Sequence, residues 1–414
     1  MNEQTQWSNV AFRADTIPSA DAKPYVFALA HLLHIGARTA MKVLLDHPNV
    51  NDLRSLNASG ERLLRTILRD RADSVLSTNW DDLLETARRE ISRHSKLGIE
   101  TISIQQDDYP YLLRLIPDPP LTLFVRGMNK TVLSKAGVAV VGTRNTTPVG
   151  EMVAKKVSRF FGENGFSVIS GLAKGIDAAA HEGALDSGAI TIAVFATPLD
   201  KVYPAENRDL AYRILDHGGA WVSELPLFKS AHRNSFVERD RIQSGLSVAV
   251  VPVQTDIKGG TMHTVGFAEK QHRMLLCPRP LQAEQSRDQY RGVKYLIETG
   301  RALAFDSADY DDILRKVRRH LIDFDIPHKH REDLADALLS VPAQDEQLSF
   351  EMVSPISDAP ISWSGKEISK LSKALRTALR SATEDEFDEL IRLIRDQLFG
   401  NLKDKSGATA SSPK

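Results

Sequence analysis

The chain has 414 residues, a formal net charge of −1, a single cysteine and 42% apolar residues, values typical of a folded protein of two or three domains. One cysteine excludes an intramolecular disulfide, which suits a reducing, cytoplasmic location. We find no secretory signal and no apolar run of about 18 residues, so no membrane attachment is expected. Because the overall charge is near neutral, any site for nucleic acid must gather its cations locally.

The amino-terminal quarter of the chain has a helical pattern. Residues 1–22 are polar and are predicted to be disordered, whereas residues 23–97 place aliphatic side chains three and four apart. This spacing predicts a small helical domain of the SAM or helix-hairpin-helix type. Its first two helical runs meet at residues 34–36, where a single glycine favours a plain helical hairpin over a DNA-binding one. Residues 99–128 contain prolines that exclude a long helix, and we expect a connector with two short strands there.

From about Lys135, short apolar segments alternate with amphipathic helical runs. Strands are predicted at residues 138–141, 166–170, 190–195, 220–223, 247–251 and 274–276. This alternation is typical of a buried, mostly parallel sheet with helices on both faces. We therefore predict an extended Rossmann-like α/β domain over residues 98–314, preceded by the small helical domain and followed by a helical C-terminal region.

The C-terminal region divides into four predicted parts. A basic helical extension covers residues 315–340, and a linker rich in proline, serine and acidic residues covers 341–365. Two further helices are expected in residues 366–402, the second of which begins with a capping box. Residues 403–414 are predicted to be a disordered tail.

The first predicted strand leads into the loop Gly142-Thr143-Arg144. A dinucleotide fingerprint needs a second glycine at the position of Arg144 and an acidic residue about 20 positions later. The second strand instead ends in Ser-Gly-Leu at residues 170–172, and the chain has no P-loop motif. We therefore expect neither NAD nor a P-loop nucleotide, and no cofactor.

Cations and aromatic residues gather in the loops that follow the predicted strands, where open α/β sheets bind their ligands. Cations can hold phosphates and rings can stack on bases, which is the chemistry of single-stranded nucleic acid. The candidate DNA- or phosphate-binding residues are Gly142, Thr143, Arg144, Gly171, Lys174, Gly175, Arg208, Phe236, Arg239, Arg241, Gly260 and Thr261. Two alternatives remain open for these residues: Arg239 and Arg241 could form a local salt-bridge cluster with Glu238 and Asp240, and Lys174 could be an ordinary surface lysine.

Catalytic patterns are weak in this sequence. Asp177 and His181 are four residues apart on a predicted helix, where the aspartate would cap the helix and the histidine would pack or pair with it. Glu224 is a conceivable general base without a recognisable partner. No catalytic triad or metal-ligand spacing is found, so we expect no catalytic residue, no metal and no enzyme.

Several stretches resemble the DNA-processing protein A family (DprA, also called Smf). They include YPYLLRLIPDPPLTLFVRG, VAVVGTRNTTPVG, VISGLAKGIDAAAHEGAL, TIAVFATPLDKVYPAEN and FVERDRIQSGLS, in order between residues 100 and 314. The resemblance implies a non-enzymatic homodimer that binds single-stranded DNA and loads the recombinase RecA during DNA uptake or recombination. It also implies DNA contacts at Arg144, Gly171, Lys174, Arg239 and Arg241. The family usually has asparagine at the position of Asp240.

A second hypothesis comes from the wider superfamily, which includes nucleotide sensors and nucleoside-monophosphate phosphoribohydrolases. The segment GGTMHTVGFAE, beginning at Gly259, partly resembles the loop and glutamate of those hydrolases. Under this hypothesis Glu224 or Glu269 would carry hydrolysis.

Overall fold

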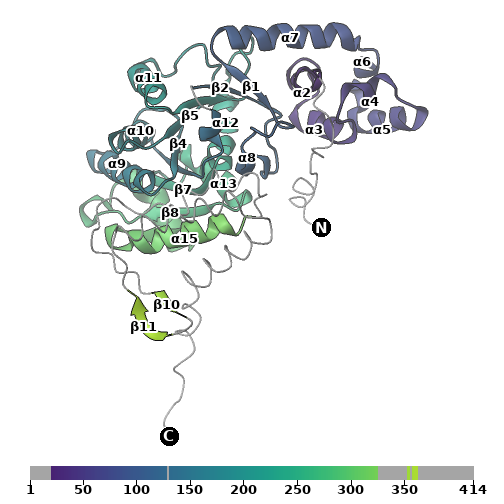
Figure 1. Cartoon of the computed structure of the whole chain (residues 1–414). Helices are drawn as coiled ribbons and strands as arrows, with labels where there is room; N and C mark the ends of the chain where they lie inside the picture. Colours follow the sequence, from purple (N-terminus) through teal and green to yellow (C-terminus); the bar gives the residue numbers. More distant parts are fainter. Residues whose placement is uncertain (1–19, 128–129, 325–351, 355–356, 362–414) are drawn as a thin grey trace.

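The computed structural model describes residues 20–127, 130–324, 352–354 and 357–361 (Figure 1). The predictions for residues 1–19, for most of the extension and linker, for the C-terminal helices and for the tail lie outside these residues. Within the predicted linker, β10 (Met352–Ser354) and β11 (Ser357–Ile361) form an antiparallel pair.

The amino-terminal region is helical, as the spacing of aliphatic residues predicts. Its helices are α2 (Ala22–His31), α3 (Ala37–Asp46), α4 (Val50–Arg54), α5 (Ala58–Leu68), α6 (Ala72–Leu76) and α7 (Trp80–Lys96). Asn49, Asn57 and Asn79 cap α4, α5 and α7 by accepting bonds from first-turn N–H groups. Between α2 and α3 the backbone turns through His34 and Gly36, which both have positive φ.

Nine strands form one sheet in the order β1-β2-β6-β5-β4-β3-β7-β8-β9. The strands from β6 to β9 in this order pair in parallel, whereas β2 pairs antiparallel with both β1 and β6. Their bounds are β1 (Glu100–Ser103), β2 (Thr122–Arg126), β3 (Gly137–Gly142), β4 (Ser167–Ser170), β5 (Thr191–Phe195), β6 (Ala220–Ser223), β7 (Ser247–Gln254), β8 (Met274–Pro278) and β9 (Leu303–Phe305). This confirms the predicted Rossmann-like, mostly parallel architecture and adds the unpredicted strand β9.

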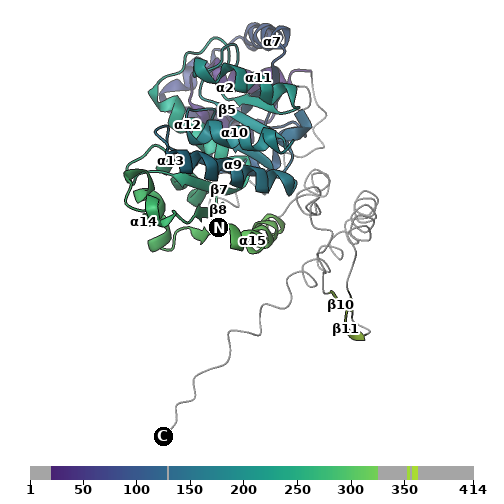
Figure 2. The same cartoon turned by 90° about the vertical axis from the view of Figure 1, so that its left-hand side faces the viewer.

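Helices cover both faces of the sheet, because alternate side chains of each strand enter different apolar clusters. In β3, Val138 and Val140 pack with α9 (Pro148–Glu163) and α10 (Ile176–Asp186), whereas Ala139 and Val141 belong to the cluster on the other face. The first face also holds α11 (Arg208–Asp216) and α15 (Tyr310–Ile322); the second holds α8 (Tyr111–Arg114), α12 (Arg233–Gly245), α13 (Thr261–Lys270) and α14 (Arg291–Glu298). Figure 2 shows α9, α10 and α11 side by side on one side of the sheet.

The helical region and the sheet share one buried apolar cluster. Tyr25 and Trp80 of the helical region belong to the same cluster as Val222 of β6. At this junction His94 of α7 stacks on Phe124 of β2, with ring centroids 4.5 Å apart. The His94 Nδ1–H donates to the Glu90 carbonyl, and Nε2 accepts the N–H of Leu227 at 3.0 Å. Although the secondary structure changes from helical to α/β near residue 98, the side chains on both sides of this point pack against each other.

At the carboxyl edge, the loops after β3 and β4 are in direct contact. The N–H of Ile176 donates to the Thr143 carbonyl at 3.3 Å. Gly175 has φ +80°, and a Cβ there would lie 2.5 Å from the Thr143 carbonyl oxygen, so only glycine allows this close approach. Thr147 caps α9 by accepting the N–H of Gly150, with Pro148 in the first helical turn. These contacts fix the backbone around Arg144.

Candidate DNA-binding pocket

A pocket of about 420 Å³ opens at the carboxyl ends of β3, β4 and β5. The loops after these three strands and the first half of α12 form its wall. Its lining residues are Arg144, Gly171, Ala173, Lys174, Ala196, Thr197, Tyr203, Pro204, Glu206, Phe236 and Arg239. Five of the candidate residues, Arg144, Gly171, Lys174, Phe236 and Arg239, thus meet in one place.

The charge of the pocket wall is positive. Arg144, Lys174 and Arg239 supply three cations against the single carboxylate of Glu206, a formal balance of +2. Lys174 Nζ forms an ion pair with the Glu206 carboxylate, and both side chains are more than half exposed. Because exposed pairs of this kind contribute little free energy, an incoming phosphate can replace Glu206 as the partner of Lys174.

Arg239 is the buried cation of the pocket. Its Nη1 donates to the Val194 carbonyl at 3.0 Å, and its Nε lies 3.3 Å from the Asp240 carboxylate. A Cβ on Gly171 would lie 1.5 Å from Arg239 Nη1, so the guanidinium occupies the space that any side chain at position 171 would need. Glycine at 171 therefore allows Arg239 to reach the pocket.

Two aromatic rings stand beside these cations. Tyr203 and Phe236 are arranged edge to face, with centroids 5.7 Å apart. The Arg144 guanidinium lies 5.7 Å from the centroid of Phe236, within cation–π range. Tyr203 is 51% exposed, so part of its ring is open to a ligand. The pocket therefore offers both charge and stacking surface.

Buried carboxylates lie behind the pocket wall. Asp177 accepts the N–H groups of Gly171 and Ala173 at 3.2 and 3.4 Å, so it braces the loop before α10 instead of capping that helix as predicted. Burial raises the pKa of Asp177. Burial also raises the pKa of Asp240 to about 6, against the opposing effect of Arg239.

His181 has a structural role. It is fully buried, in agreement with the packing alternative of the prediction, and its Nδ1 lies 2.7 Å from Thr191 Oγ1 of β5, so it does not pair with Asp177. Burial lowers the pKa of His181 to about 3, with a smaller contribution from Arg239, which keeps the imidazole neutral at physiological pH. It does not line the pocket.

Arg241 is placed differently from its predicted role. Its Nη2 is 2.5 Å from the Glu224 carboxylate and its Nε is 3.5 Å from that of Asp118, with only 8% of the side chain exposed. The local salt-bridge alternative therefore describes only Arg239, which contacts Asp240 and also lines the pocket. The partners of Arg241 are Glu224 and Asp118 and not the neighbouring acids that this alternative named. Arg241 is not available to a ligand in this structure.

The remaining candidate residues lie outside the pocket lining. Gly142, Thr143 and Gly175 form the loop contacts beneath Arg144, where a Cβ on Gly142 would collide with Ile176. Gly260 and Thr261 begin α13 after β7, and Arg208 begins α11, next to the pocket but not in its wall. Conversely, the candidate set omitted Tyr203 and Glu206, although both lie in the same predicted loop as Arg208.

The two acids of the hydrolase hypothesis are engaged elsewhere. Glu224 pairs with Arg241, and both carboxylate oxygens of Glu269 accept bonds of 2.7 Å from Arg301. Neither glutamate lines the pocket. Within the described part of the chain, no group of acidic, histidine or cysteine residues is arranged to hold a metal ion. No helix in those ranges is long and apolar enough to span a membrane.

Fold and pocket together define an extended Rossmann-like protein with a cationic, aromatic pocket at the carboxyl edge of its sheet. Residues 100–318 match the family model of DNA recombination-mediator protein A, and the chain belongs to this family of DNA-processing proteins. It is 34% identical over 213 residues to the DNA processing protein DprA of Bacillus subtilis, covering 51% of this chain and 71% of that protein. The DprA of Streptococcus pneumoniae is 38% identical over 174 residues, which cover 42% of this chain and 60% of that one. The X-ray structure of the Streptococcus pneumoniae protein aligns with a TM-score of 0.53 and 27% identity, covering 69% of this chain and 96% of that chain.

Proposed function

We propose that this protein binds single-stranded DNA in the pocket and takes part in recombination. The observation that carries the proposal is the meeting of Arg144, Lys174 and Arg239 with Tyr203 and Phe236 in one cleft. Cations along the backbone and rings for the bases are the shared design of single-strand binding sites. A paired base inside a duplex has no free face to stack on a side chain, so unpaired nucleotides suit this pocket best.

The pocket can hold a nucleotide through two kinds of contact. Arg144 follows Thr143 and Lys174 precedes Gly175, so each lies next to the contact between the two loops and would bind a backbone phosphate. The buried Arg239 would contact the ligand from the interior wall of the pocket. A base would stack against the exposed part of Tyr203 or Phe236. Such binding needs no cofactor, no metal and no catalytic residue, so we propose a binding protein and not an enzyme.

The family description supports a wider role. A recombination mediator delivers a recombinase to single strands, so we propose that a RecA-type recombinase is the protein partner and that the chain works in the cytoplasm as a homodimer. A strand-exchange assay on single-stranded DNA that is coated with a single-strand-binding protein tests the proposed recombinase partner. The protein should shorten the lag before recombinase filaments form, and an unchanged lag would refute the recombinase proposal alone.

A salt-titrated binding experiment tests the DNA proposal. Fluorescent oligo-dT should bind with a log affinity that falls linearly with log salt concentration, because counterions are released. Arg144→Ala and Lys174→Ala should each weaken binding and reduce the magnitude of the slope by about 0.7, the value for one phosphate on a single strand. Arg159→Ala and Lys156→Ala remove the same charges from exposed positions on α9 and are the matched controls.

The result that would refute the DNA proposal is equally specific. If oligo-dT affinity is negligible at low salt while a nucleoside monophosphate raises the melting temperature, the pocket is a mononucleotide site. If all four alanine variants weaken binding equally, the DNA contact is general electrostatic attraction and not the pocket.

A further inference from the structure

The outer surface of α11 carries an arginine and an exposed aromatic ring directly beside the pocket. We propose that Arg208 and Tyr212 form a second nucleotide subsite, which holds a base and phosphate of the same single strand after it leaves the pocket. This inference rests on the proposed function and extends it.

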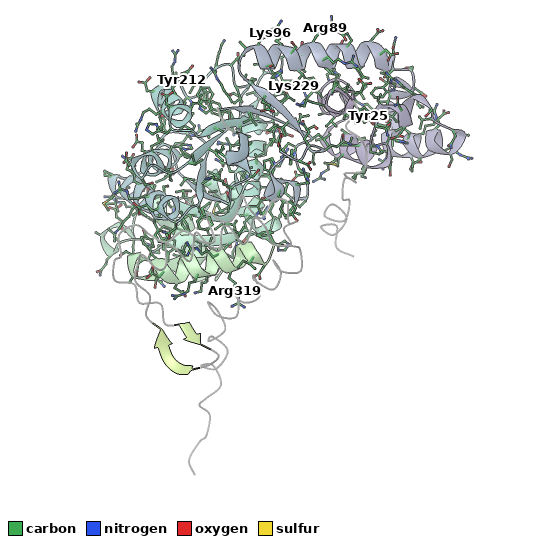
Figure 3. All side chains as sticks on the ribbon, viewed as in Figure 1. Tyr25, Arg89, Lys96, Tyr212, Lys229 and Arg319 are labelled. Atoms are coloured by element: carbon green, nitrogen blue, oxygen red, sulfur yellow. The ribbon has the colours of Figure 1, made fainter. Side chains whose placement is uncertain are left out.

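The two side chains form a prepared stacking surface. Arg208 and Tyr212 are four residues apart on α11 and so share a helix face, with the guanidinium carbon 6.0 Å from the ring centroid. Tyr212 is 39% exposed, and Figure 3 shows it at the outer side of α11. Its ring packs edge-on against Trp221, with centroids 5.3 Å apart. Trp221 is 1% exposed and its Nε1–H donates to the Ala211 carbonyl, so this support is rigid.

The subsite is continuous with the pocket. Glu206, which lines the pocket, lies in the short helix Ala205–Asn207, and α11 begins at the next residue, Arg208. The Asn207 amide donates to the Leu172 carbonyl at 2.8 Å and so ties this junction to the loop that carries Lys174. From Glu206 to Tyr212 the helical rise amounts to about 10 Å. A neighbouring nucleotide can therefore reach Tyr212 while another occupies the pocket.

A second exposed arginine–tyrosine pair, Arg301 and Tyr295, differs from Arg208 and Tyr212 in the charge of its arginine. The guanidinium of Arg301, which follows α14, lies 5.6 Å from the ring of Tyr295 on α14, and Tyr295 is 37% exposed. Arg301, however, is held by both carboxylate oxygens of Glu269, which neutralises its charge. Arg208 forms no ion pair with any residue in the described ranges, so its charge remains available for a phosphate.

The length of the bound ligand provides the test. Affinities are measured for two lengths of ligand: the single nucleotide dTMP, which cannot reach Tyr212 from the pocket, and oligo-dT of about 12 nucleotides, which can occupy both places. Tyr212→Ala should weaken binding of the oligonucleotide about tenfold, the effect of removing one base–aromatic stack, and leave the affinity for dTMP unchanged. Tyr212→Phe should restore binding, and Arg208→Gln should flatten the salt dependence for the oligonucleotide only. Tyr295→Ala is the matched control and should change neither affinity.

The outcomes separate this inference from the proposed function. If Tyr212→Ala binds both lengths like Tyr295→Ala while Arg144→Ala still weakens both, the pocket stands and the second subsite is refuted. If neither length binds to the unaltered protein, the proposed function fails and the subsite fails with it. Tyr212→Leu keeps the apolar cover of Trp221 without a ring to stack, so it replaces Tyr212→Ala if that variant loses its thermal transition.

Discussion

Asp240 places a carboxylate immediately behind the buried cation of the pocket. Its oxygen lies 3.3 Å from Arg239 Nε, and the Asp240 side chain is only 14% exposed. Since burial raises the pKa of Asp240 to about 6, the group is ionised at pH 8 and mostly neutral at pH 5. At pH 8 its negative charge should oppose a phosphate at Arg239. We therefore expect Asp240→Asn to tighten single-stranded DNA binding at pH 8 and to change it little at pH 5.

The magnitude of the binding effect follows from distance. A phosphate bonded to Arg239 would be about 7 Å from the Asp240 carboxylate, if one hydrogen-bond length is added on the far side of the guanidinium. Two charges at that distance repel by about 0.6 kcal/mol in water and by about 2.4 kcal/mol at an effective dielectric constant of 20. Asp240→Asn should thus bind oligo-dT about threefold to fiftyfold more tightly at pH 8.

The free energy of unfolding should change in the same variant. The pKa of Asp240 is raised from 3.8 to about 6 in the folded protein, which corresponds to about 3 kcal/mol. With the folded pKa above the unfolded one, this stabilisation is complete below pH 4 and is lost as the pH rises through 6. Asp240→Asn should therefore melt at a higher temperature than the unaltered protein at pH 8 and at a similar temperature at pH 4.

Fluorescence anisotropy at pH 5 and pH 8 measures the binding effect, and thermal melting at pH 4 and pH 8 measures the effect on stability. The informative quantity is the difference between the two proteins at each pH, because it cancels the titration of distant groups that both proteins share. If Asp240→Asn weakens binding at pH 8, the carboxylate serves to orient Arg239, and our electrostatic reasoning is wrong.

Two further substitutions test the packing around the pocket. Gly171→Ala puts a methyl group where Arg239 Nη1 now lies, so oligo-dT affinity should fall about tenfold, the cost of one displaced charged hydrogen bond. Gly266→Ala adds a methyl group in open space on α13 and should leave the affinity unchanged. Equal effects of the two variants would contradict the contact between Gly171 and Arg239. Glu224→Gln leaves the buried Arg241 with only one carboxylate partner, the more distant Asp118. The free energy of unfolding should therefore fall by about 3 kcal/mol in a denaturant titration, while the folded protein keeps its DNA affinity. A loss of affinity without a loss of stability would show that Arg241 contacts DNA after all.

Sequence patterns predicted the sheet well, because buried parallel strands require uninterrupted apolar residues between helical segments. All six expected strands are present as β3 to β8, with ends that differ by a few residues. Strand β9 escaped prediction because it has only three residues, Leu303 to Phe305, and is shorter than the runs of about four to eight residues that indicate a strand.

The structure brings the loops after β3, β4 and β5 together in one pocket, but the segment with Phe236, Arg239 and Arg241, expected as a loop, is the helix α12. Arg239 and Arg241 were treated as one motif, yet both lie within α12. Two residues apart on a helix, side chains differ by about 200° in direction, so only one of them can face the pocket. Side-chain direction also separates Arg208 from its neighbours. Arg208, the first residue of α11, lies beside the ring of Tyr212 one turn further along the helix, whereas Tyr203 and Glu206, which precede α11, line the pocket.

The junction at His94 bears on how the protein can be divided. The secondary structure changes near residue 98, which suggests that the chain could be truncated there into a helical part and a part that contains the pocket. Yet Leu227 donates to the His94 ring, and the loop that contains Leu227 leads directly into α12 with its pocket residues Phe236 and Arg239. Removing the helices would strip apolar cover from β2 and β6 and free the segment that orients α12. The amino-terminal helices are thus better regarded as part of the frame that shapes the ligand site than as an exchangeable appendage.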